Sequence, residues 1–219
     1  MRALRRQLCI ALLGLVTGAA LAADPQAGVQ YKALAAPQPT DTGRRVEVIE
    51  FFAYYCPHCY AFEPVLADWV KRQGDAIVFK RVHVPRDAGV LPQQRLFYTL
   101  DAMGLLDQYH TRVFKAMHAQ HLRLSSDEQV FDWAAQNGID RARFTDVYRS
   151  FGIDARLRRA SAMMDAYGVD RWPLVVIDGR WVTSPSHAGE GSGATEAQQQ
   201  QQALQVMDFL VAKAKADKR

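Results

Sequence analysis

Apolar residues along the chain alternate between short β-branched runs and longer stretches with helical spacing. Residues 46–52 are mostly β-branched and aromatic, which indicates a buried strand. The apolar positions that follow Cys59 recur at helical spacing, and Gly74 ends the predicted helix. Residues 77–84 form a second predicted strand. Strand, helix and strand in this order make a βαβ unit, so the two strands should be parallel.

The middle of the chain has a different pattern. Residues 90–167 contain no convincing strand and consist of amphipathic segments with local stop signals. We expect Ser125 and Glu128 to form a capping box that opens one helix, and Asp140 and Asp154 to open two more. The pattern therefore predicts a helical insertion between the halves of a smaller α/β core.

The strand pattern resumes after this insertion. Residues 174–177, an Asp-Gly pair and residues 180–183 predict a hairpin, because Asp-Gly suits a type I′ turn. Thr195 with Gln198 can cap a final helix. Near the N-terminus, residues 31–36 predict a short edge strand. Together these patterns predict an α/β protein whose core is split by helices.

Composition and charge narrow the functional classes. Of the 219 residues, 49% are hydrophobic and 23% charged, which excludes wholesale disorder. The formal net charge is +4, from 27 basic and 23 acidic side chains. Without Arg2, Arg5 and Arg6, the remaining 24 basic side chains leave a net charge of +1. This balance does not indicate a nucleic-acid-binding surface, and we expect no nucleic-acid partner.

The first 22 residues have the pattern of a secretory signal peptide. A basic start precedes an apolar stretch at 8–16, and small residues end the segment as Ala20-Leu21-Ala22. An uncleaved anchor is the alternative, but anchors usually run longer. Cleavage after Ala22 would remove Cys9 and deliver the mature chain to a compartment that permits disulfides.

Cys56 and Cys59 are the two cysteines of the predicted mature chain, and they lie at a strand-to-helix junction. A disulfide that closes so small a loop removes little chain entropy, which favours a chemical role over a structural one. At a helix start, free N–H groups and the macrodipole favour a thiolate at Cys56. His58 adds a donor, and Pro57 suits the first helical position. We therefore expect Cys56 to attack and Cys59 to resolve.

Other functions are possible for a Cys-x-x-Cys pair. It could bind zinc, but a second ligand pair is missing. His118 and His121 lie three residues apart, which a solvent-exposed helix face explains as well as a metal site does. A peptide-binding chaperone with incidental cysteines is an alternative from another class. We expect no metal and no cofactor besides the redox-active disulfide. The histidines outside the motif form no metal-spaced set with the cysteines: His83, His110, His118, His121 and His187.

Two residues outside the motif are candidates for the site. Pro173 precedes a predicted core strand, and a cis peptide after Trp172 would expose backbone groups to a bound extended peptide. An ordinary trans proline at a strand start is the more common case. Glu50 lies in an otherwise apolar strand, where burial should raise its pKa and suit a proton acceptor for the resolving thiol. A structural acid paired with Lys80 or Arg81 is the alternative.

The segment Glu50–Glu63, with Cys56-Pro57-His58-Cys59 at its centre, resembles the active-site segment of the DsbA family of periplasmic thiol:disulfide oxidoreductases. The resemblance extends through Pro173 and Asp178-Gly179, so it covers nearly all of the mature chain. It implies an α/β thioredoxin fold with an inserted all-helical domain. The expected division is a signal peptide at 1–22, a thioredoxin domain at 23–86 and 152–219, and a helical insertion at 87–151.

The resemblance also implies roles for individual residues. Cys56 would be the nucleophile, Pro173 a cis-proline beside it, and Glu50 the buried acid beneath the disulfide. Trp172 departs from the family pattern, in which a small or β-branched residue usually precedes the cis-proline. With Pro173 it would form part of the substrate-binding surface, so we expect the departure to affect substrate range and pairing with the oxidase rather than the chemistry.

The implied activity is that of a periplasmic dithiol oxidase. It would donate its disulfide to newly exported proteins and be reoxidised by a quinone-linked membrane oxidase of the DsbB type. A disulfide isomerase or reductase on the same fold is the close alternative. Isomerases of this type usually carry a separate dimerisation domain, for which residues 24–44 are too few, so we expect a monomer.

Overall fold

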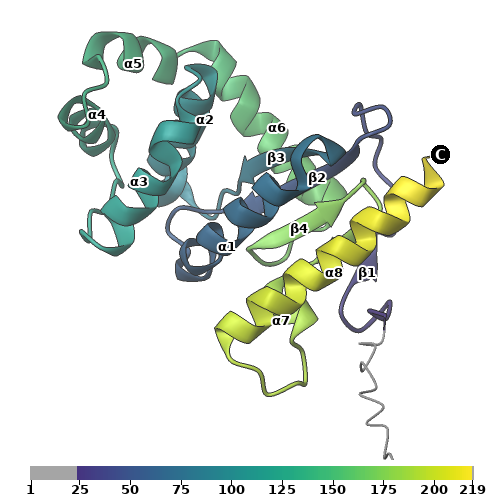
Figure 1. Ribbon diagram of the computed structural model, residues 1–219. Coiled ribbons are helices and arrows are strands. Elements are labelled where there is room, and N and C mark those ends of the chain that lie inside the picture. The colour runs from purple at the N-terminus through teal and green to yellow at the C-terminus, as the bar shows by residue number, and fades with distance from the viewer. Residues whose placement is uncertain (1–23, 219) are drawn as a thin grey trace, which may run out of the picture.

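A computed structural model describes residues 24–218, which fold around one mixed β-sheet (Figure 1). The predicted signal peptide and Cys9 lie outside the described residues. The strand order in the sheet is β1-β5-β4-β2-β3. The strands are β1 (Lys32–Ala33), β2 (Val46–Phe52), β3 (Ile77–His83), β4 (Leu174–Ile177) and β5 (Trp181–Thr183).

The centre of the sheet is the predicted βαβ unit. β2 and β3 are parallel, with Val46 opposite Ile77, and α1 (Pro57–Gln73) connects them through the short 3₁₀ turn η1 (Gly74–Ala76). β2 also pairs with β4, in the antiparallel direction. All seven residues of β2 are buried, the five apolar ones and also Glu47 and Glu50, as expected for a strand covered on both faces. The predicted parallel pairing is confirmed.

The hairpin of β4 and β5 closes one side of the sheet. Its turn holds Asp178 and Gly179 at φ values of 52° and 62°, as a type I′ turn requires. A Cβ atom on Gly179 would lie 2.2 Å from the backbone oxygen of Gln38, so only glycine fits there. The predicted edge strand is also present, because β1 pairs with β5.

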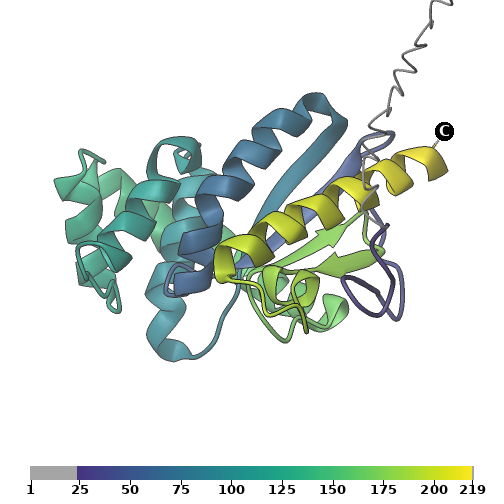
Figure 2. The ribbon, with the colours of Figure 1, turned by 60° about the horizontal axis from the view of Figure 1, so that its bottom comes forward.

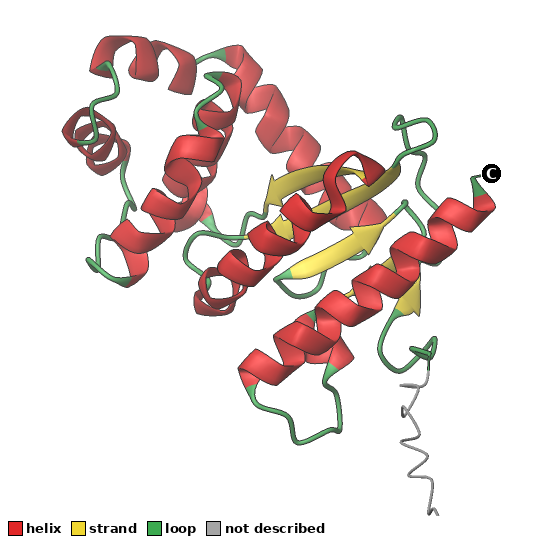
Figure 3. Cartoon of the chain, viewed as in Figure 1, coloured by secondary structure: helices red, strands yellow, loops and turns green. Residues whose placement is uncertain are grey.

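Helices cover both faces of the sheet (Figure 3). α1 and α8 (Glu196–Asp217) lie side by side over one face, and the Trp69 indole donates to Asp208 at 2.8 Å between them (Figures 1 and 2). α6 (Phe151–Tyr167) packs on the other face, where the ring of Tyr167 contacts Phe51. α7 (Pro185–Ala188) precedes α8, and the predicted capping box of Thr195 and Gln198 opens α8.

The remaining helices gather at one end of the molecule, away from the β1 edge (Figure 1). They follow β3 and lead into α6, as the predicted helical insertion requires. The domain boundaries placed on the sequence remain a prediction. None of the helices within residues 24–218 has the length and apolar character needed to cross a bilayer. The gathered elements are η2 (Ala88–Val90), α2 (Leu91–Ala102), α3 (Leu106–His118), α4 (Asp127–Gln136) and α5 (Arg141–Tyr148).

Two predicted helix starts in this region are wrong. α4 is capped by Ser126, whose hydroxyl accepts from the N–H of Gln129, and Ser125 lies one residue too early. α6 is capped by Ser150, so Asp154 falls in its first turn. Serine and aspartate are both good caps and sit close together here, so local sequence does not choose between them. The third predicted start is confirmed, because the α5 cap is Asp140.

Candidate active site

The Cys-Pro-His-Cys motif lies where β2 passes into α1. Cys56 is the N-cap of α1, and its sulfur accepts from the backbone N–H of Cys59 at 3.4 Å. Pro57 occupies the first helical position, as its fixed φ and missing N–H predict. No disulfide joins the two sulfurs in this structure. Cys56 is 5% exposed and Cys59 is fully buried, so the first sulfur is the one that another molecule can reach.

This placement separates the acidities of the two thiols. The pKa of Cys56 falls to about 6, chiefly because the Cys59 thiol hydrogen bonds to it. The backbone N–H groups of Cys59 and His58 and the charge of His58 also lower the pKa of Cys56, against the effect of burial. Burial raises the pKa of Cys59 well above its ordinary value, and the neighbouring Cys56 sulfur raises it further. At neutral pH the pair therefore holds one thiolate and one thiol.

Pro173 faces the motif from a distant part of the chain. The Trp172–Pro173 peptide bond is cis, and the Trp172 carbonyl oxygen lies 3.7 Å from the sulfur of Cys56. A hollow of about 170 Å³ beside Pro173 is bordered by His58 and Glu196. Trp172 is half-buried, and its indole packs edge-on against the ring of Tyr55. The structure thus brings Pro173 and Trp172 to the motif, as the family resemblance implies.

His58 makes a contact that the sequence does not predict. Its Nδ1 atom lies 2.7 Å from Oε1 of Glu196, in the first turn of α8. This hydrogen bond raises the pKa of His58, with the charge of Glu196 acting in the same direction. Both side chains are largely exposed, so the pair is weakly stabilising. Its effect is to favour the imidazolium beside the Cys56 sulfur.

A buried charge cluster lies beneath the motif. Arg81 donates from Nε to Glu50 at 3.0 Å and from Nη2 to both oxygens of Glu63, at 2.9 and 3.0 Å. Nε2 of His110 lies 3.4 Å from Glu63, and its Nδ1 lies 2.9 Å from the Tyr54 hydroxyl. One guanidinium is therefore shared between two buried carboxylates, and the cluster extends from the sheet to α3.

The two carboxylates of this cluster differ in acidity. Burial raises the pKa of Glu50 to about 8, against the opposing charge of Arg81. Burial also acts to raise the pKa of Glu63, but the contacts with His110 and Arg81 outweigh it and leave that pKa lowered. Glu50 is thus the member of the cluster that can exchange a proton near neutral pH. The sequence offers Lys80 and Arg81 as ion-pair partners for Glu50. The structure pairs Glu50 with Arg81, because Lys80 pairs with Glu47.

Sequence reasoning missed three residues of this arrangement as parts of the site. Glu63 and His110 had a detectable signal, because each is a polar residue on the buried stripe of an amphipathic helix. Glu196 had none, since a glutamate in the first turn of a helix is ordinary.

Two further histidines, His83 and His118, have structural partners near the motif. His83 accepts the N–H of Tyr54 at 3.1 Å, and burial lowers its pKa to about 3. His118 donates to the Tyr54 carbonyl at 2.7 Å and stacks on the ring of Tyr60. In the described part of the chain, no group of three or more His, Cys, Asp or Glu side chains is placed to hold a metal ion.

Comparisons with known proteins place this geometry in a family. The family model described as a DSBA-like thioredoxin domain matches residues 81–205. The thiol:disulfide interchange protein DsbA of Bordetella pertussis is 39% identical over 206 residues, which are 94% of this chain and 94% of that protein. The protein of the same name from Pseudomonas aeruginosa is 32% identical over 99% of this chain and 98% of its own length.

Solved structures agree with these relatives. The crystal structure of Pseudomonas aeruginosa DsbA superposes with a TM-score of 0.80 at 30% identity, over 88% of this chain and 96% of that chain. The crystal structure of reduced DsbA1 from Neisseria meningitidis gives a TM-score of 0.74 at 26% identity, over 90% of this chain and 98% of that chain. The fold is the thioredoxin fold with additional helices that these structures share. With most of its length matched by such relatives, the chain belongs to the DsbA family of thiol:disulfide oxidoreductases.

Proposed function

We propose that the protein is a dithiol oxidase that transfers the Cys56–Cys59 disulfide to reduced, newly exported polypeptides. The observation that carries this proposal is the unequal acidity of the two thiols, with the pKa of Cys56 lowered and that of Cys59 raised. A stabilised Cys56 thiolate favours the reduced protein, which makes the disulfide form an oxidant. The periplasm is the compartment in which such an oxidant would act.

The transfer proceeds by two thiol–disulfide exchanges. A substrate thiolate attacks the sulfur of Cys56, the Cys56–Cys59 bond breaks, and Cys59 leaves with the electron pair and takes a proton. A second substrate thiolate then attacks the mixed disulfide, and Cys56 leaves as a thiolate. The substrate has lost two electrons and the protein has gained them. Each half is favoured by the positions of the sulfurs, because Cys56 is reachable and its low pKa makes it a good leaving group.

The surroundings of Cys56 supply the remaining roles. His58 stabilises the thiolate, and Pro57 sets the start of α1 so that the N–H groups face the sulfur. The Trp172 carbonyl lies beside the sulfur, where an extended substrate can pair with it. Reoxidation is assigned to a quinone-linked membrane oxidase of the DsbB type, as in the family. The disulfide itself is the redox group, with no further cofactor and with the monomer as the working unit.

Equilibration with glutathione tests the assignment as an oxidase. Lowering the pKa of Cys56 from 9.0 to about 6 makes the couple more oxidising by up to roughly 90 mV, at about 30 mV for each pKa unit. We therefore expect the protein to be mostly reduced at ratios of reduced to oxidised glutathione that leave ordinary protein disulfides intact. Tryptophan fluorescence measures the ratio of the two forms, since the Trp172 indole packs on Tyr55, the residue before Cys56. If the redox potential of the Cys56–Cys59 pair is as low as that of structural disulfides, the protein is instead a reductase.

We assign Glu50 as the proton acceptor for Cys59, and a Glu50→Gln variant tests the assignment. Reduced protein is mixed with oxidised glutathione, and release of the second glutathione reports the attack of Cys59 on the mixed disulfide. We expect this step to slow by roughly 10²-fold, the lower end of the usual contribution of a general base. Its rate in the unmodified protein should also rise with pH through about 8, the pKa of Glu50.

Glu47→Gln is the matched control for this variant. Glu47 is a buried acid on the same strand, but it pairs with Lys80 rather than with the cluster beneath the motif. The Glu47→Gln variant should leave unchanged both the rate at which Cys59 attacks the mixed disulfide and the pH profile of that rate. An unaltered rate and pH profile in Glu50→Gln would assign Glu50 a purely structural role.

A further inference from the structure

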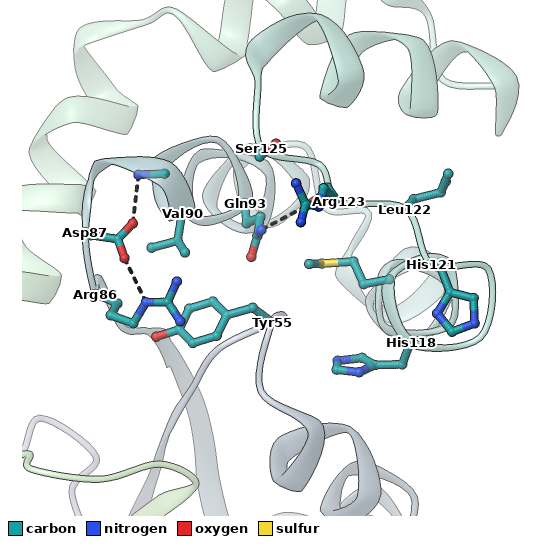
Figure 4. Close-up of a pocket in the computed structure, with 12 residues that line it drawn as sticks. Tyr55, Arg86, Asp87, Val90, Gln93, His118, His121, Leu122, Arg123 and Ser125 are labelled. Carbon is teal, nitrogen blue, oxygen red and sulfur yellow. Dashed lines mark hydrogen bonds and ion pairs between the residues drawn. The ribbon is translucent and has the colours of Figure 1, made fainter.

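A second pocket opens beside the redox motif, on the side of the gathered helices. It encloses about 450 Å³ between the β3–α2 connection, α2 and the end of α3 (Figure 4). Tyr55, which directly precedes Cys56, forms part of its wall, and the ring of Tyr55 packs against Trp172 with centroids 6.2 Å apart. The pocket thus adjoins the redox site but shares no lining residue with the hollow beside Pro173.

Positive side chains outnumber negative ones around this pocket. Asp87 carries the one carboxylate among the lining residues, and it is already engaged. One of its oxygens lies 2.8 Å from Nε of Arg86 and the other accepts the N–H of Gly89 at 2.8 Å. Arg86 also lies over the ring of Tyr55 at 4.6 Å. Arg123 is exposed at the rim, and within residues 24–218 no carboxylate lies within ion-pair distance of it.

A buried acceptor faces the same space. Gln93 is 4% exposed, and its Nε2 donates to the Arg123 carbonyl at 2.9 Å, which fixes the orientation of the amide. Its Oε1 has no hydrogen-bond partner among the described residues, and Figure 4 shows this oxygen directed into the pocket. The hydroxyl of Tyr55 likewise has no partner there. Buried polar atoms are rarely left without partners, so these two atoms are available to a donor and an acceptor from a bound molecule or from water.

The loop that carries Arg123 is held in one shape. His121 and Leu124 both have left-handed backbone conformations, with φ values of 59° and 48°. Such a conformation is costly for leucine, and it persists here because Leu124 is buried at 2% exposure and Gln93 anchors the loop. The guanidinium of Arg123 is thereby presented at the rim by a backbone that is already ordered.

We propose that this pocket binds an acidic side chain of the polypeptide substrate, on one side of its reactive cysteine. The carboxylate would pair with Arg123, a substrate backbone N–H would donate to Gln93, and a substrate carbonyl would accept from Tyr55. An extended chain supplies all three groups, and it can pass from Cys56 into the pocket along the Tyr55 wall. The inference rests on the proposed oxidase function and names a substrate class for it: cysteines with a nearby aspartate or glutamate.

Peptides with a single cysteine test this preference. A neutral peptide is compared with versions that carry glutamate, glutamine or lysine at each position from three residues before the cysteine to three after it. Two peptide thiols reduce one protein disulfide and form a peptide disulfide, and tryptophan fluorescence follows the reduction. We expect glutamate on one side of the cysteine to raise the second-order rate about 3- to 10-fold over glutamine at low salt, and less at high salt.

Variants of Arg123 show whether the pocket causes the preference. In Arg123→Gln the glutamate-to-glutamine rate ratio should fall to about 1, and in Arg123→Glu the lysine peptide should become the faster one. Arg143→Gln is the matched control, because it removes an exposed arginine of α5 that does not line the pocket. That control should keep the full ratio.

The outcomes separate the two proposals. Equal acceleration by glutamate on both sides of the cysteine, or a ratio that survives in Arg123→Gln, would overturn the pocket assignment while leaving the oxidase intact. Failure of the unmodified protein to oxidise the neutral peptide would instead overturn the oxidase function itself. Acceleration by glutamate on only one side of the cysteine, together with a preference for lysine in Arg123→Glu, supports both the oxidase function and the pocket assignment.

Discussion

A Cys59→Ala variant is expected to lose catalytic turnover and to accumulate mixed disulfides with its substrates through Cys56. Cys56 keeps its place at the N-terminus of α1 and remains the reachable sulfur. Loss of the Cys59 hydrogen bond weakens the stabilisation of its thiolate, but the backbone N–H groups and His58 still favour it, so Cys56 can still attack a disulfide. The buried thiol that would displace the bound partner is gone. The covalent complexes should therefore persist, and non-reducing electrophoresis of exported proteins followed by mass spectrometry would detect them.

A Cys56→Ala variant provides the comparison. It should lose turnover as completely but trap almost nothing, because Cys59 is fully buried and its pKa is raised. Both variants remove one sulfur from the same turn, so general effects on folding should be similar. If complexes formed only in Cys56→Ala, the roles assigned to the two cysteines would be reversed.

The reduced protein is expected to be more stable than the oxidised protein, by an amount that grows as the pH rises from about 6 towards 8. The pKa of Cys56 is about 6 in the folded protein against an ordinary 9.0. A depressed pKa stabilises the folded state fully above the unfolded value, and this stabilisation is lost as the pH falls through the folded value. The oxidised form has no thiolate at this position and lacks the dependence.

The size of this effect follows from the pKa difference. The shift of Cys56 from 9.0 to about 6 corresponds to at most about 4 kcal/mol of unfolding free energy, and partial access of solvent to the sulfur reduces it. Above about pH 8 the raised pKa of Cys59 opposes any further gain, since that thiol ionises more readily in the unfolded chain.

Denaturant titrations of both forms at pH 5, 6, 7 and 8 measure this dependence. The midpoint of the reduced form should move above that of the oxidised form as the pH rises, and the ultraviolet absorbance of the thiolate should titrate in the same range. Equal midpoints at pH 7, or a more stable oxidised form, would contradict the assignment as an oxidant.

Local sequence was sufficient for the elements that carry the motif. The strand at 46–52 and the helix that ends at Gly74 are found as predicted, and the parallel strand predicted at 77–84 is found at 77–83. Their apolar spacing and stop signals depend on residues close in sequence, and so does the position of Cys56 at a helix start. The helix starts at Ser126 and Ser150 were misplaced because neighbouring residues offered equally good caps.

The electrostatics of the site needed the tertiary structure. The burial that raises the pKa of Glu50, and the sharing of Arg81 between Glu50 and Glu63, both depend on how α1 packs over the sheet. The pocket beside Tyr55 likewise exists because the loop after α3 folds back against α2. No sequence pattern encodes these distances, since each joins elements that are placed by the packing of the whole core.

The sequence by itself therefore determined the reactive pair, its strand-to-helix setting and the order of the core elements. Only the tertiary structure decided which groups surround the reactive sulfur. The Trp172 carbonyl that contacts Cys56 lies 116 residues further along the chain, and the Glu196 carboxylate that contacts His58 lies 138 residues beyond it. The reason is physical. Helix and strand signals act over a few neighbouring residues, whereas a pKa responds to charge, burial and hydrogen bonds across a few ångströms of space, whatever their separation along the chain.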